Sequence, residues 1–60
     1  MKEFHIEGSP NGTVIMGEYV QADTEDEAIA TWKAAHQGWQ FERVLEVPLG
    51  CNYLGIPRPR

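Results

Sequence analysis

The feature that most restricts the fold of this chain is a helix-start signal between two stretches of strand-like residues. In Asp23-Thr24-Glu25-Asp26-Glu27, the hydroxyl of Thr24 can cap the first helical amides, and the carboxylate of Glu27 can reach back to the cap residue. Apolar residues then recur at helical spacing as far as Gly38, a residue that favours the left-handed backbone at helix ends. The sequence therefore predicts one helix of about three to four turns.

Two segments before this helix carry the patterns of β-strands. In residues 2–7, Phe4 and Ile6 alternate with polar residues, which predicts a strand with one face in solvent. Turn residues fill 8–12 and predict a hairpin, and 13–22 is rich in β-branched and aromatic residues. Gly17 interrupts the second strand, which indicates either a bulge or a close approach to the backbone.

A third strand pattern follows the helix and completes the predicted fold. Residues 39–49 alternate, and one face carries Trp39, Phe41, Leu45, Val47 and Leu49. Pro48 restricts further pairing. Residues 50–56 could add a short fourth strand or wrap the core. We expect a single α+β domain over 1–56, in ββαβ order, with one helix packed on one face of an antiparallel sheet. Residues 57–60 are expected to form an extended, mobile Pro/Arg tail. The predicted core is Phe4, Ile6, Val14, Met16, Val20, Ile29, Trp32, Phe41, Leu45 and Val47.

A core of this size is only marginally sufficient for a chain of 60 residues. Ordering costs about 1.5 kcal/mol per residue, which roughly cancels the gain from burial. The sequence offers no disulfide or obvious metal site to compensate. We therefore expect a homodimer, formed through a sheet edge or an exposed apolar face, unless a partner protein supplies the missing burial.

The charge balance restricts the partners. Five Lys and Arg against nine Asp and Glu give a formal charge of −4, which disfavours direct binding to nucleic acid or an anionic membrane and favours a protein with a basic surface. The longest apolar runs are three residues, too short to cross a bilayer. A single Cys51 and the lack of a signal-peptide pattern lead us to expect a cytoplasmic location.

Chemistry-bearing residues are few and widely spaced. His5, His36 and Cys51 lack the short spacing of zinc ligands, and so small a domain has little room to enclose a substrate around a nucleophilic thiol. His36 is better explained as a partner of the helix dipole. We expect no metal, no cofactor and no catalytic residues.

Carboxylates and aromatic residues are the candidate partner-binding groups. The acids around the helix start suit ordinary helix design, because the dipole favours negative charge there, but they also suit a docking surface for a basic partner. Glu42 and Glu46 add to this charge and would face the acids of the first strand if the two strands were neighbours. Trp39 and Tyr53 are typical interface anchors. The predicted partner-binding set is Glu18, Asp23, Glu25, Asp26, Glu27, Trp39, Glu42, Glu46 and Tyr53.

Two resemblances suggest functions. The segment Ala22-Asp23-Thr24-Glu25-Asp26-Glu27-Ala28-Ile29 resembles the strand-to-helix junction of HicB-type antitoxins, although the turn that family has between its second and third strands is missing. In size, charge and element order, the chain resembles small phage-encoded inhibitors of bacterial defence, such as anti-CRISPR proteins. That resemblance implies a non-enzymatic inhibitor that acts in the host cytoplasm as a DNA mimic, blocking a basic nucleic-acid-binding surface of a defence complex. The alternative is a HicB-like antitoxin or accessory subunit that docks through an apolar strand edge and aromatic surface.

Overall fold

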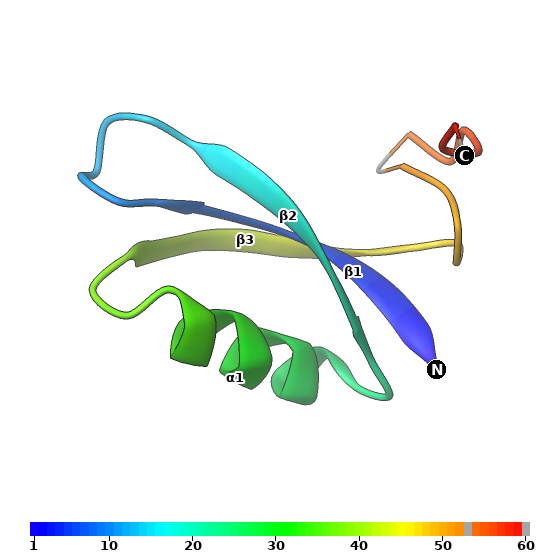
Figure 1. Ribbon diagram of the computed structural model, residues 1–60, viewed down its shortest axis with the longest axis horizontal. Coiled ribbons are helices and arrows are strands. Elements are labelled where there is room, and N and C mark those ends of the chain that lie inside the picture. The colour runs from blue at the N-terminus through cyan, green and yellow to red at the C-terminus, as the bar shows by residue number, and fades with distance from the viewer. Residues whose placement is uncertain (53, 60) are drawn as a thin grey trace.

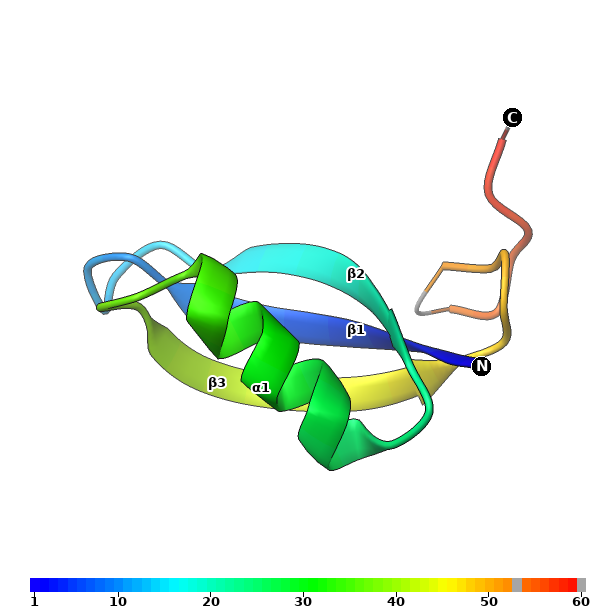
Figure 2. The ribbon, with the colours of Figure 1, turned by 60° about the horizontal axis from the view of Figure 1, so that its bottom comes forward.

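The computed structural model describes residues 1–52 and 54–59, and in these it contains three strands and one helix. The elements are β1 (Lys2–Ser9), β2 (Met16–Ala22), α1 (Glu25–Ala35) and β3 (Gln40–Val47). The strands form an antiparallel sheet in the order β2-β1-β3, with β1 in the centre. Helix α1 covers one face of the sheet, and the C-terminal segment lies at the other side (Figures 1 and 2). This arrangement confirms the predicted α+β fold and its ββαβ order.

The loop between β1 and β2 is stabilised by hydrogen bonds from its own backbone amides to the side chains of Ser9 and Asn11. Ser9 Oγ accepts a hydrogen bond from the Gly12 amide at 2.7 Å, and Asn11 Oδ1 accepts from the amides of Thr13 and Val14 at 2.9 and 3.0 Å. These bonds replace strand pairing, so β2 starts only at Met16. Val14 and Met16, which we expected in the core, are 51% exposed, and that prediction was wrong.

A β-bulge in β3 changes which residues face the helix. Glu7 pairs with Arg43 and Gly8 pairs with Phe41, so Glu42 has no partner on β1. The extra residue shifts the alternation by one position. Phe41 therefore lies on the helix face, while Leu45 lies on the opposite face beside His5.

This shift corrects two predictions about β3. Leu45 is exposed, so it does not share a buried face with Phe41. The expected repulsion between acids of β1 and β3 is also wrong, because Glu7 lies opposite Arg43, with Arg43 Nε 2.5 Å from Glu7 Oε1. Glu46 lies opposite Phe4 rather than opposite an acid.

The core lies between α1 and the sheet, around Trp32. Its buried residues are Phe4, Ile6, Ala22, Ala28 and Trp32, with Val20, Trp39, Phe41 and Val44 partly buried against them. The Trp32 ring packs directly on the backbone of Gly8, where an added Cβ would lie 2.3 Å from the ring. Gly8, expected in the turn, is therefore a strand residue that makes room for the ring.

Helix α1 begins and ends close to where the sequence predicts. Thr24 has an extended backbone and its side chain accepts a hydrogen bond from the Glu27 amide at 3.2 Å. The reciprocal bond, from the cap amide to the Glu27 carboxylate, is not formed among the described residues. His36 caps the C-terminal end, and Gly38 follows with a φ of 86°. The capping signal thus placed the helix correctly.

The face of β1 away from α1 is buried, contrary to the prediction of a solvent-exposed face. Glu3 and His5 are only 3% and 7% exposed. The His5 ring lies against Gly17, where an added Cβ would be 2.4 Å from His5 Nε2. The register of β1 with β2 runs unbroken past Gly17, so this glycine marks a close approach and not a bulge.

The C-terminal segment folds into a loop beside this second face. The Asn52 amide donates a hydrogen bond to the Ile56 carbonyl, and the Arg58 amide donates one to the Gly50 carbonyl. Cys51 and Pro57 form an isolated antiparallel β-bridge. Residues 50–56 therefore add no further strand to the sheet within the described range. The mobility of 57–60 stays a prediction, but Pro57 and Arg58 make defined contacts, and Arg60 lies outside the described residues.

Candidate protein-binding surface

The first turn of α1 presents a compact group of carboxylates. Glu25, Asp26 and Glu27 are all exposed, and no ion pair among the described residues includes them. The oxygen of Asp23 lies 3.9 Å from the N-terminal amine of Met1, with both groups well exposed. We call Asp23, Glu25, Asp26 and Glu27 the helix-start carboxylates. Asp23 lies just before the N-cap and the other three lie in the first turn of α1, and all four are exposed to solvent.

The other predicted acids, Glu18, Glu42 and Glu46, lie on β2 and β3. Glu18 contacts His36 near the opposite end of α1, and the 11 residues of the helix span about 15 Å. Glu46 lies 3.9 Å from Lys2 Nζ, and Glu42 is exposed at the bulge. Of the predicted acids, Asp23, Glu25, Asp26 and Glu27 therefore lie at the start of the helix, and Glu18 lies near its other end. Tyr53, predicted as an aromatic anchor, lies outside the described residues.

A second feature is a small pocket at the C-terminal end of α1. Its volume is about 270 Å³, and it is lined by Met16, Gly17, Glu18, Trp32, His36 and Trp39. The Trp32 and His36 rings stack with centroids 4.9 Å apart, and Trp39 meets both rings edge-on. Trp39, predicted as a surface anchor, is half-buried in this aromatic cluster.

In this pocket, both ring nitrogens of His36 make polar contacts. Nδ1 lies 2.8 Å from the Trp32 carbonyl oxygen, and Nε2 lies 2.5 Å from Glu18 Oε2. Both neighbours are hydrogen-bond acceptors, so either ring nitrogen can donate to its neighbour when it carries a proton. The sequence predicted the dipole role of His36, but the contact with Glu18 depends on how α1 packs on β2.

On the opposite face, Glu3 accepts hydrogen bonds from three groups. They are the guanidinium of Arg58, the Gly50 amide at 3.3 Å and the Gln21 side-chain amide at 3.5 Å. The bond from Arg58 lowers the pKa of Glu3 below its ordinary value of 4.5, and the other two donors act in the same direction. Burial opposes them, so the donors outweigh desolvation. Sequence reasoning missed this site because Glu3 looked like a solvent-facing strand residue.

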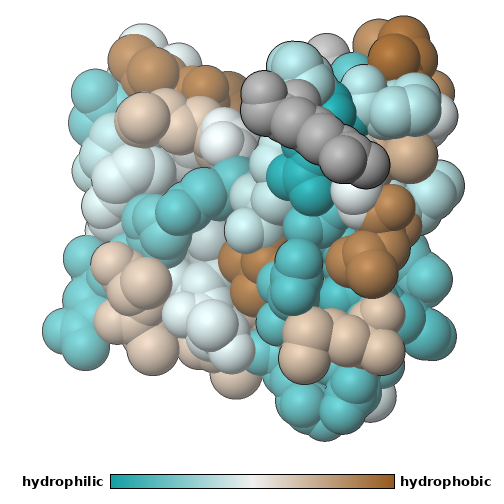
Figure 3. Space-filling view, turned by 45° about the vertical axis from the view of Figure 1, so that its right-hand side comes forward, coloured by the Kyte–Doolittle hydropathy of each residue, from teal (hydrophilic) through white to brown (hydrophobic). Residues whose placement is uncertain are grey.

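Exposed apolar side chains form a third kind of surface. The large exposed residues are Met1, Val14, Ile15, Met16, Leu45, Leu49, Leu54 and Ile56. Figure 3 shows hydrophobic side chains in separate patches with hydrophilic residues between them. The group at 14–16 is continuous along the chain and adjoins the pocket through Met16.

Comparison with protein-family models, curated proteins and solved structures finds no match to this chain. Among the residues described, no helix is both long and apolar enough to cross a bilayer. The resemblances to HicB-type antitoxins and to phage-encoded inhibitors stay predictions.

Proposed function

We propose that this protein is a non-enzymatic binding protein whose helix-start carboxylates dock on a basic surface of a partner protein. The observation that carries the proposal is the exposure of Glu25, Asp26 and Glu27 on one helical turn without intramolecular cations among the described ion pairs. Charge complementarity of this kind accelerates association and selects partners. The formal charge of −4 on the whole chain also favours association with a basic partner.

The finer form of the proposal names the partner class. In size and charge the chain resembles phage-encoded inhibitors of bacterial defence, so the partner would be the nucleic-acid-binding surface of a defence complex. The carboxylates would take the positions that phosphates occupy in the nucleic acid. Added salt would then weaken the binding of this protein to its partner, and DNA would compete for the same surface of the partner.

A matched pair of charge variants tests the proposal. In the first, Glu25→Gln, Asp26→Asn and Glu27→Gln remove three negative charges. In the control, Thr31→Lys, Ala34→Lys and Gln37→Lys change the net charge by the same amount at exposed positions further along. Each protein is used to capture partners from bacterial lysate, which are identified by mass spectrometry.

Wild type and control should capture the same nucleic-acid-binding protein, and duplex DNA should displace it. The neutralised variant should lose affinity by about tenfold or more. Equal capture by the neutralised variant, or capture insensitive to DNA, would contradict the proposal. Circular dichroism of all three proteins checks that the helix is intact.

The exposed apolar run at 14–16 favours the second candidate, an antitoxin-like or accessory subunit. Val14, Ile15 and Met16 are exposed, and Met16 also lines the aromatic pocket that contains Trp39. If this surface carries the binding, Ile15→Ala and Trp39→Ala should weaken capture more than neutralising the helix start does. The same assay therefore separates the two candidates.

A further inference from the structure

Glu3 is a buried carboxylate that needs a cation. Its side chain is 3% exposed, and it accepts hydrogen bonds from the Gly50 amide and the Gln21 side chain in addition to Arg58. A carboxylate buried without a compensating cation is strongly disfavoured. In the structure, the guanidinium of Arg58 supplies the positive charge.

The surroundings of Glu3 suit a planar guanidinium better than an ammonium. The central carbon of the Arg58 guanidinium lies 4.3 Å from the centroid of the Tyr19 ring. A guanidinium stacks on an aromatic ring while its edge donates to a carboxylate, whereas an ammonium has no planar face to stack. Tyr19 and Glu3 therefore contact two different parts of the same group.

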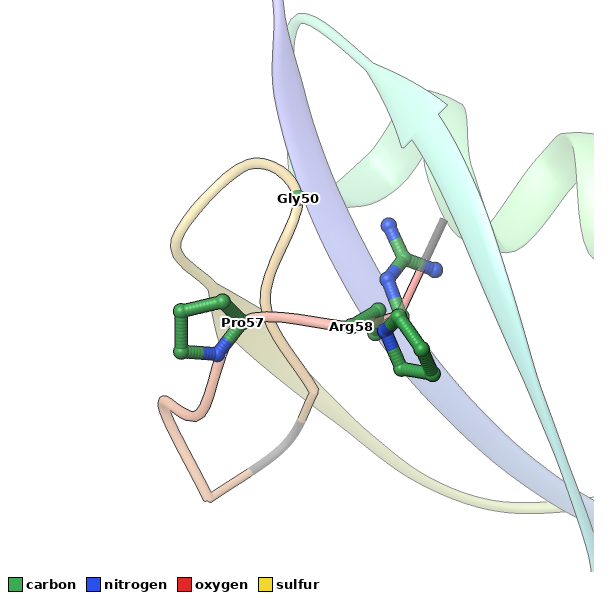
Figure 4. Close-up of a pocket in the computed structure, with 4 residues that line it drawn as sticks. Gly50, Pro57 and Arg58 are labelled. Carbon is green, nitrogen blue, oxygen red and sulfur yellow. The ribbon is translucent and has the colours of Figure 1, made fainter.

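Among the described residues, the main chain around Arg58 pairs only with the loop that begins at Gly50, and it is the Arg58 side chain that contacts the sheet. The Arg58 amide donates to the Gly50 carbonyl at 2.9 Å, and the flanking Pro57 and Pro59 have no amide to donate. Both prolines lie beside an open cavity of about 530 Å³ (Figure 4). Figure 4 shows the guanidinium extending from the tail over the sheet.

We propose that Glu3, Tyr19, Gln21 and Gly50 form a binding site for an arginine side chain, which Arg58 fills and which an arginine of another peptide chain can fill in its place. The tail is then an exchangeable occupant of a site built by the sheet and the Gly50 turn. This site lies on the face away from α1, so it does not depend on the helix-start carboxylates.

Chemical rescue tests whether the site recognises guanidinium. Arg58→Ala should lower the Tm by about 5 °C or more. Millimolar methylguanidinium should restore part of this loss in a saturable way, while methylammonium or sodium at equal ionic strength should not. The double variant Glu3→Gln, Arg58→Ala should show no rescue. Rescue by all three cations, or by none, would overturn the proposal.

A peptide titration tests exchange with another chain. The probe is an acetylated peptide Gly-Ile-Pro-Arg-Pro, which reproduces residues 55–59, and the control peptide has lysine in place of arginine. Saturable NMR shifts of Tyr19 and Gln21 in the Arg58→Ala protein, seen with the arginine peptide alone, support the proposal. Methylguanidinium rescue without peptide binding overturns it.

Arg58→Lys provides a second host if Arg58→Ala does not fold. The lysine retains the positive charge but lacks the planar group, so the arginine peptide should displace it from Glu3 and produce the same shifts. Failure of the arginine peptide to shift Tyr19 and Gln21 in this variant would also overturn the proposal.

Discussion

Two glycines position rings by the absence of a side chain. Gly8 leaves space for Trp32, the largest buried residue, and Gly17 leaves space for the ring of His5. The two rings lie on opposite faces of the sheet, because Gly8 pairs with Met16 on the helix side while Gly17 pairs with Glu7. Both glycines are therefore packing residues at strand positions, where glycine is otherwise unfavourable.

Gly8→Ala should destabilise the protein by about 1–3 kcal/mol, because the new methyl group must displace the Trp32 ring. Urea unfolding followed by tryptophan fluorescence measures the change. Gly38→Asn is the control, since nothing lies within 4 Å of a Cβ there and asparagine tolerates the left-handed backbone. A Gly8→Ala protein as stable as wild type would show that the ring does not rest on this backbone.

Glu3 should make stability depend on pH. Its pKa is lowered by folding, mainly through Arg58, so ionised Glu3 stabilises the fold above its ordinary value of 4.5. That contribution is lost as the pH falls below 4.5 through the depressed pKa. Glu3→Gln should lower the Tm at pH 7 by about 5 °C and by progressively less toward pH 3.

Thermal unfolding of wild type and the Glu3→Gln protein across this pH range checks the prediction. Glu42→Gln serves as the control at an exposed carboxylate. A Tm difference between wild type and Glu3→Gln that is constant with pH would show that the Glu3 charge does not contribute.

At the level of elements, local signals predicted the helix and long-range packing decided the strands. The capping hydroxyl of Thr24 and the stop at Gly38 act within one turn of the chain, so the sequence alone located α1. The bulge at Glu42 depends on pairing with β1. Its one local sign is the adjacent pair Glu42-Arg43, which interrupts the alternation between Phe41 and Val44.

The candidate sites also differ in whether local signals or long-range packing determine them. The helix-start carboxylates were predictable because they follow one another in the sequence around the N-cap Thr24. The site around Glu3 was not, since it joins Gly50 and Arg58 to a strand nearly the whole chain away. Glu3 contacts Gly50 and Arg58, and no periodic signal in the sequence predicts these contacts.

Thr24→Ala should destabilise α1 by about 1 kcal/mol, because the Glu27 amide loses its hydrogen-bond acceptor. Thr24→Ser retains the hydroxyl and should match wild type within error. Helix content by circular dichroism and urea unfolding together report the effect. Equal loss in both variants would point to packing of the Thr24 methyl group instead of capping.

At the level of the whole molecule, the two sheet edges differ. The β3 edge carries a bulge, three charged residues and a following proline, devices that block pairing with another sheet. The β2 edge has unbroken register and a single charged residue, Glu18. Apolar residues 14–16 lead directly into it. A second copy of the chain would therefore pair at β2.

Sedimentation of the wild-type chain should show a concentration-dependent monomer–dimer equilibrium. Val14→Lys with Ile15→Lys should shift it to monomer, because two charges replace apolar side chains beside this edge. Leu45→Lys with Leu49→Lys adds the same charge away from β2 and is the control. Equal dissociation by both pairs of substitutions would indicate a general charge effect.

The central position of β1 also determines when this chain can fold during synthesis. β1 precedes the other described elements in the sequence, yet one of its two neighbours in the sheet is β3, the last of them. Glu3, for example, pairs with Val47 at the end of β3. Until β3 has emerged from the ribosome, the hairpin has an unpaired central strand and Trp32 lacks the ring of Phe41 against it. Before β3 pairs with it, β1 therefore has an open backbone edge, to which chaperones or early assembly partners would bind.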